Sequence, residues 1–273
     1  MRLLFAVLLA FCADRIDADS LITWPLTNEA ATPVDGGASN ALLIVGQFDR
    51  VSPGSGGGGG SFDWIRADPD AGRTLSIGVA SYSLADSRWT YGRAAGGWRA
   101  GENMVVEGLA SFGGGNSGGT HFGYCVLDAA LDYQIVPAVW LKAEDKFVDI
   151  GDSHGHLLKV GTLLVPTNRI VVDLGYARSA GGNLNSEIIS GRVDWSAADA
   201  RWFGGYAHGR AVPDLFGVDV GGGMPSQASR EWFVGVAIPV SPLELTGVFD
   251  TVDVNASRRR TFTFSIRMPL GRT

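Results

Sequence analysis

The feature that most constrains this chain is a two-residue alternation of apolar and polar side chains that persists through long segments. The clearest example is 261–268, which reads TFTFSIRM, with Phe, Ile and Met at even positions and Thr, Ser and Arg at odd ones. Such an alternation places successive side chains on opposite faces of a β-strand. The same pattern recurs at 169–176, 231–238 and 243–250. The chain is therefore expected to be all-β.

The length of these segments separates two architectures. Strands in soluble sheets average about 5 or 6 residues, whereas a tilted membrane strand needs about 9 to 11. A large soluble sandwich could bury the apolar faces, but it does not explain why nearly every segment is long. In lipid an open sheet edge would leave backbone groups unpaired, so the strands must close. The pattern predicts a closed antiparallel transmembrane β-barrel.

Fourteen strands are expected, and without the first two the count would be twelve. Their ranges are 41–51, 61–67, 74–84, 88–99, 103–113, 120–133, 137–149, 153–165, 168–179, 184–195, 199–210, 227–239, 243–253 and 258–270. Connections after odd-numbered strands are the long, glycine-rich ones, including the run 56–60 and the longest, 211–226. Bacterial barrels have short periplasmic turns and long outer loops. This parity predicts that both termini are periplasmic.

The N-terminal region reads as a secretory signal. Arg2 precedes an apolar run, and polar residues follow from Asp14, which is the architecture of a signal peptide. We expect a signal peptide over 1–18, an irregular periplasmic leader over 19–40 and the barrel over 41–270, located in the bacterial outer membrane. The net charge of −6 and the lack of a basic run exclude a nucleic-acid partner.

Charged residues on the polar faces are expected to line the lumen, because Arg or Lys facing lipid at mid-membrane costs about 2–4 kcal/mol. This set comprises Lys142, Glu144, Lys146, Arg169, Asp173, Arg192, Asp194, Glu244, Asp250 and Arg267. Asp145 departs from the pattern, since it falls on an apolar face. Aromatic residues near strand ends, among them Trp89, Tyr91, Trp98, Tyr176, Trp195 and Trp232, are expected to form girdles at the membrane interfaces.

Two classes of function follow. The first is a non-enzymatic barrel, either a narrow channel or a structural, export-associated protein. The alternative is an outer-membrane hydrolase, because His121, His154, His156 and His208 all fall at the outer strand ends and histidine suits acid–base work near neutral pH. No phosphate loop, zinc spacing or nucleotide fingerprint is present, so no metal or cofactor is expected.

The C-terminal third resembles the YaiO-type outer-membrane barrel family. The similarity lies in the segments 202–210 and 232–236 and in the terminal strand from Arg259. Relatives of that family accompany exopolysaccharide systems, so the resemblance implies glycan-export components as partners, beside the lipid bilayer and the outer-membrane assembly machinery. It assigns no functional residue.

Overall fold

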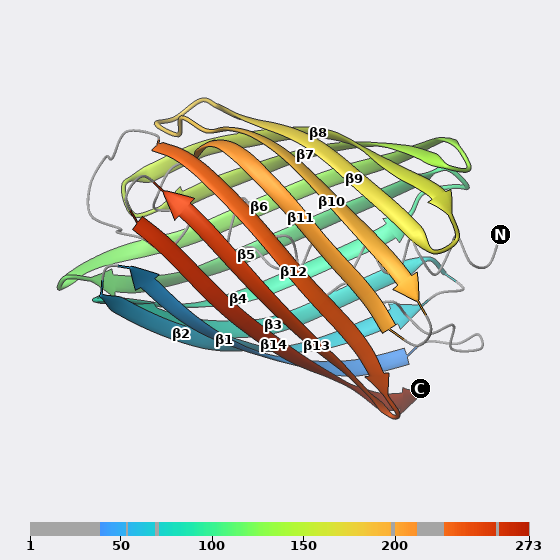
Figure 1. The fold of residues 1–273 in the computed structure, drawn as a ribbon, viewed down its shortest axis with the longest axis horizontal. Helices are drawn as coiled ribbons and strands as arrows, with labels where there is room; N and C mark the ends of the chain where they lie inside the picture. The colour runs from blue at the N-terminus through green and yellow to red at the C-terminus, as the bar shows by residue number, and fades with distance from the viewer. Residues whose placement is uncertain are drawn as a thin grey trace.

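A computed structural model describes residues 39–52, 54–68, 71–197, 200–211, 227–254 and 257–272, and these form one closed β-barrel (Figure 1). The strands are β1 (Ser39–Ser52), β2 (Ser55–Asp68), β3 (Arg73–Leu84), β4 (Ser87–Arg99), β5 (Met104–Ser117), β6 (Thr120–Val136), β7 (Val139–Ile150), β8 (Ser153–Thr167), β9 (Ile170–Ala180), β10 (Glu187–Ala197), β11 (Ala200–Ala211), β12 (Gln227–Val240), β13 (Leu243–Val254) and β14 (Ser257–Arg272). No helix in these ranges is long and apolar enough to cross a membrane.

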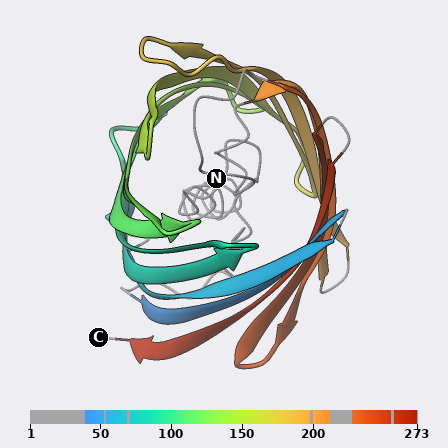
Figure 2. The same cartoon turned by 90° about the vertical axis from the view of Figure 1, so that its left-hand side faces the viewer.

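Closure comes from β1, which pairs antiparallel with β2 on one side and with β14 on the other. Ile44 lies opposite Phe62 of β2 and Ile266 of β14. Strands β2 to β13 each pair with their two neighbours in sequence, and the end-on view shows the complete ring (Figure 2). The predicted fold is confirmed with fourteen strands rather than twelve, so no backbone edge is left open among the described strands.

The two ends of the barrel differ in what they carry. β1 begins and β14 ends on the right of Figure 1, which we call the terminal end; the opposite side, with the hairpins of β1–β2 and β13–β14, is the loop end. Five of the loop-end hairpins have two-residue connections, at 53–54, 85–86, 118–119, 151–152 and 255–256. The expected contrast between long and short connections is therefore wrong for these five hairpins, because their strands continue further than the sequence pattern indicated.

The glycine run 56–60 accounts for the largest difference. It was expected to be a flexible loop, but it forms the first half of β2. A Cβ on Gly57 would lie 2.2 Å from the carbonyl oxygen of Ser83, and one on Gly59 would lie 2.4 Å from the ring of Tyr82. Glycine is needed here because the neighbouring backbone and ring approach too closely for a side chain. An alternation of apolar and polar residues cannot reveal a strand built from glycine.

The strand pleat sorts side chains by face. Large apolar residues such as Phe48, Ile77, Val160 and Val234 are about half exposed or more on the outer face. Serine, threonine and charged residues fill alternate positions on the inner face, where most are buried. Trp98 and Trp195 lie outward near the terminal end, as a girdle requires.

Trp89 and Tyr91 are corrections to the expected girdle. Tyr91 is 1% exposed, and Trp89 packs against the same inner cluster. Both rings point into the barrel because they share parity with the inner residue Arg93.

The expected signal peptide, 1–18, and the leader to residue 38 lie outside the described residues, as does most of the connection 211–226. At the borders of these ranges, Ser39 and Asn40 belong to β1 and Ala211 closes β11.

Candidate functional site: the inner wall of the barrel

The inner wall carries ion pairs that bridge strands. The most buried joins Asp63 of β2 to Arg93 of β4, across the intervening β3. The Arg93 Nε donates to Asp63 Oδ1 at 2.8 Å and Nη2 donates to Oδ2 at 2.6 Å, so the pair is bidentate. Ser61 accepts a further bond from Arg93 at 3.0 Å. Bidentate arginine–carboxylate pairs have a defined geometry, so this contact holds three strands in register.

A second group of charges lines β6 to β10. Its pairs are Lys142–Asp173, with Nζ to Oδ2 at 2.5 Å, Lys146–Asp128 at 3.6 Å, Lys159–Glu144 at 3.8 Å and Arg192–Asp194 at 2.7 Å. Lys142 on β7 reaches Asp173 on β9 past β8, which presents Gly161 opposite Lys142. Because Gly161 has no side chain, it leaves room for the Lys142–Asp173 ion pair to cross the middle strand. The sector therefore has alternating charge rather than one sign.

A third group, on β12, β13, β14 and β1, is acidic. Glu231 is 1% exposed, and neither carboxylate oxygen has a hydrogen-bond partner among the described residues. Asp250 is also buried, and its Oδ1 lacks a partner there as well. Asp49 accepts bonds from Arg259 at 2.8 Å and from Thr261 at 2.7 Å. This sector therefore gathers the carboxyl groups of Glu231, Asp250 and Asp49 on the part of the wall between β12 and β1.

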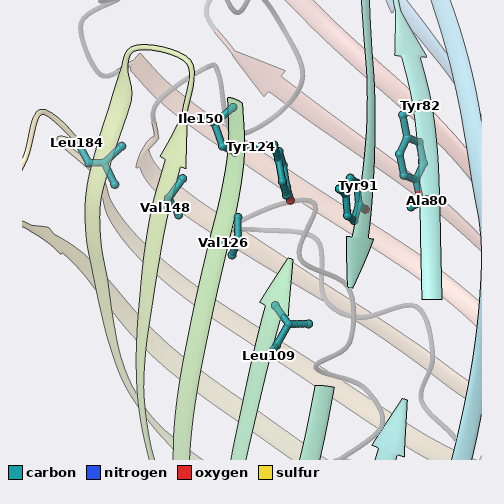
Figure 3. Close-up of a cluster of buried hydrophobic side chains, with 9 residues drawn as sticks. All are labelled: Ala80, Tyr82, Tyr91, Leu109, Tyr124, Val126, Val148, Ile150 and Leu184. Atoms are coloured by element: carbon teal, nitrogen blue, oxygen red, sulfur yellow. The ribbon is translucent and has the colours of Figure 1, made fainter. Parts of the chain in front are cut away.

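A hydrophobic cluster that includes Tyr82, Tyr91 and Tyr124 extends from β3 to β7 and to Leu184 on the loop-end half of the wall (Figure 3). The rings of Tyr91 and Tyr124 stack with centroids 4.7 Å apart. These residues lie two strands apart, and Gly113 of β5 lies between them, opposite both. A Cβ on Gly113 would be 2.5 Å from the Cα of Tyr91. The missing side chain thus permits the stack.

Nearly all the charged residues expected in the lumen fall on inner-face positions of the strands. Lys142, Lys146, Asp173, Arg192, Asp194 and Asp250 are buried, and Glu144, Glu244 and Arg267 share the inward parity. Arg169 is a correction: it lies in the β8–β9 turn and is exposed. Its carbonyl accepts a bond from the Ser196 N–H, so the backbone at this residue belongs to the turn.

Sequence reasoning missed several inner-wall residues. Among them are Asp49, Asp63, Arg93, Lys159, Arg201 and Arg259. Asp63 and Arg93 lie in glycine-rich strands, where the apolar alternation that identifies the facing is weak. Parity counted from Phe62 of β2 and from Trp98 of β4, which both lie on the outer face, would have placed them.

The four histidines do not form one site. All four are exposed, at outward positions of β6, β8 and β11. His208 Nδ1 contacts the Ser229 carbonyl oxygen at 3.0 Å, and the His154 backbone N–H donates to Asn183 Oδ1. Among the described residues, no hydroxyl or thiol side chain bonds to a histidine ring, and no group of three metal-ligand side chains occurs.

His156 instead partners the aspartate that broke the alternation. Its Nδ1 lies 2.9 Å from Asp145 Oδ1, with both side chains about half exposed on the outer face. The ring of Phe147 lies 5.2 Å from that of His156. The polar side chain at an outward position is therefore matched by a second polar group on the next strand.

Comparisons with known proteins relate this chain to outer-membrane barrels by fold. No family model and no curated protein sequence matches it. Among solved structures, the CymD monoaromatic hydrocarbon channel matches with 10% identity over 88% of this chain and 90% of the other, at a TM-score of 0.60. The toluene transporter TodX of Pseudomonas putida matches with 11% identity over 95% and 97%, at 0.55. A bacterial polysaccharide outer membrane secretin matches with 11% identity over 87% and 100%, at 0.50. The chain thus has the closed antiparallel barrel fold of outer-membrane channel proteins.

Proposed function

We propose that this protein is a non-enzymatic channel of the bacterial outer membrane. The observation that carries the proposal is the division of the barrel wall into an apolar outer face and a charged, hydroxyl-rich inner face. In a bilayer the closed sheet pairs the backbone groups of the strands with one another, and the division of the two faces turns polar side chains away from lipid. Barrels of more than eight strands have interiors wider than their own side chains fill, so fourteen strands provide space for a solute path.

The terminal end is proposed to face the periplasm. An even strand number puts both ends of the barrel on the same side, and in bacterial barrels that side is periplasmic. The two connections with more than four residues, 181–186 and 212–226, then belong to the outer side. A secretory route through a signal peptide in 1–18 and assembly by the outer-membrane machinery complete this placement.

The preferred solute is proposed to be small, neutral and hydroxylated. Most basic groups of the inner wall are already paired with carboxylates, which reduces ion selectivity, while Thr246, Thr261, Thr263 and Ser265 offer hydroxyl groups side by side on β13 and β14. Sugars use hydroxyl partners and aromatic faces, and the wall contains both chemistries. A link to exopolysaccharide export is compatible with this preference and rests on the YaiO-type resemblance.

Solute flux through reconstituted vesicles tests the proposal. Vesicles with the folded barrel should swell in glucose or maltose, and the same protein should show discrete conductance steps in a planar bilayer. Thr263→Trp, on the inner wall, should reduce the flux, whereas Phe264→Trp, on the outer face of the same strand, should leave it unchanged. Absence of swelling and of conductance with a correctly folded barrel would refute the channel.

The same preparation separates the competing functions. Uptake of toluene without uptake of sugar would favour an apolar solute, of the kind for which the toluene transporter TodX is named. Release of fatty acids from phospholipid would favour the hydrolase.

A further inference from the structure

The outer face of the barrel carries a row of basic side chains at the loop end, which the channel proposal does not use. Adjacent strands contribute His208 of β11, Arg230 of β12, Arg258 and Arg260 of β14 and Arg50 of β1. All five are exposed. With Asp253 of β13 they line a surface hollow of about 680 Å³. A protein of net charge −6 thus concentrates positive charge at one place on its outer wall.

The row contains too few carboxylates to neutralise it. Asp253 bonds to Arg258 through both of its oxygens. Within the part of the chain that the structure describes, no carboxylate pairs with Arg50, Arg230 or Arg260. Among the described residues, three guanidinium groups of the row therefore share one carboxylate, Asp253, which is already bonded to Arg258.

Two of these groups face each other directly. Arg50 and Arg260 are cross-strand partners in the β1–β14 pair. Like charges directly opposite each other destabilise an antiparallel strand pair. The β1–β14 strand pair that contains the two arginines is the one that closes the barrel. An anion bound between them would turn the repulsion into attraction, since arginine binds phosphate oxygens through two parallel N–H donors.

The surroundings of the row indicate where the anion comes from. One step further from the loop end, Phe48 lies opposite Phe262, which lies opposite Phe249. Trp232 packs on Phe249 with centroids 5.5 Å apart. Aromatic side chains mark the edge of the hydrocarbon region, so the arginines lie at the height of lipid headgroups, directly above an acyl-chain surface.

We propose that Arg50, Arg230 and Arg260 bind the phosphate groups of a phosphorylated glycolipid in the outer leaflet. The headgroup sits in the hollow, its phosphates bridge the Arg50–Arg260 pair and Arg230, and its acyl chains lie along Phe48 and Phe262. This inference rests on the membrane placement proposed above.

Binding to the purified, folded barrel in a choline-headgroup detergent tests this inference without reference to transport. Bisphosphorylated lipid A is the probe, measured by native mass spectrometry, with phosphatidylcholine and inorganic phosphate as comparisons. Lipid A should bind, phosphatidylcholine should not, and millimolar phosphate should compete weakly. Arg50→Gln with Arg260→Gln should reduce lipid A affinity by about tenfold or more, because two charge-assisted contacts are lost. Arg88→Gln, an exposed arginine at the loop end of β4 outside the hollow, should bind as the wild type does.

The stability of the folded barrel gives a second measurement, in which the order of the wild type and the double variant should reverse when lipid A is added. Without lipid A, the Arg50→Gln/Arg260→Gln variant should unfold at the same urea concentration as the wild type or a higher one, since a repulsion is removed; with lipid A the wild type should be the more stable. Equal binding by wild type and double variant, or equal binding of lipid A and phosphatidylcholine, would overturn the inference. Inorganic phosphate that displaces lipid A completely would assign the site to free phosphate instead. A barrel that binds lipid A but conducts no solute would refute only the channel.

Discussion

Arg93 binds Asp63 across an entire strand, and Gly78 of β3 is the residue that makes this possible. Gly78 lies opposite both partners, opposite Asp63 of β2 and Arg93 of β4. A Cβ on Gly78 would lie 1.8 Å from Asp63 Oδ1 and 2.7 Å from the carbonyl oxygen of Phe62. The salt bridge therefore occupies the space that any other residue at position 78 would need.

Gly78→Ala should destabilise the barrel by about 3–5 kcal/mol, the cost of breaking a buried ion pair. The measurement is urea unfolding in detergent, followed by tryptophan fluorescence. Gly123→Ala is the matched control, because that strand glycine has nothing within 4 Å of an added Cβ. Asp63→Asn should be similarly costly, and Asp63→Asn combined with Arg93→Gln should cost less than the sum of the two single changes. Additive losses would show that the two residues are not coupled.

The facing of the strands predicts the effect of introduced charge. Val234→Arg, on the outer face where Val234 is 49% exposed, should cost about 2–4 kcal/mol in a bilayer. Thr246→Arg, on the inner wall near the acidic sector, should cost much less. Folding titrations into phosphatidylcholine vesicles measure both. Equal costs would contradict the assignment of inner and outer faces.

The tyrosine stack should contribute measurable coupling. A double-mutant cycle of Tyr91→Ala and Tyr124→Ala should give an interaction of about 0.5–1.5 kcal/mol, the range for aromatic pairs. The cycle of Tyr82→Ala and Tyr91→Ala should give less, because those centroids are 6.4 Å apart rather than 4.7 Å. The same unfolding assay applies. A larger coupling for the more distant pair would argue against direct stacking as its origin.

The Asp145–His156 contact should behave as a unit. His156→Ala leaves a carboxylate on the outer face without its partner at 2.9 Å, so stability in vesicles should fall, by up to about 2 kcal/mol, because an Asp on the lipid face costs less than the roughly 2–4 kcal/mol of an Arg or Lys. Combining His156→Ala with Asp145→Leu should restore the stability, since an apolar outward residue replaces the charge. If the double variant is less stable than His156→Ala, the pair does not face lipid.

Cysteine labelling checks the proposed orientation. In a Cys125→Ser background, a cysteine at the exposed turn residue Asp86, at the loop end, should react with an impermeant maleimide on intact cells. A cysteine at Glu102, in the exposed turn at the terminal end, should react only after the outer membrane is opened. The reverse pattern would invert the topology.

The sequence by itself determined the architecture, because alternation along strands such as Thr261–Met268 is a local property that the pleat converts directly into two faces. Parity from such strands also places Lys142, Asp173 and Arg192 on the wall.

Only the tertiary structure decided what depends on neighbouring strands. The glycine run 56–60 forms part of β2 because Tyr82 and Ser83 of β3 approach it, and a run without side chains has no alternation to read. The partners of Arg93 and of Tyr91 lie two strands away, and the Arg50–Arg260 pair joins residues at the two ends of the barrel sequence. Such contacts are set by the register and closure of the sheet, which depend on all strands together.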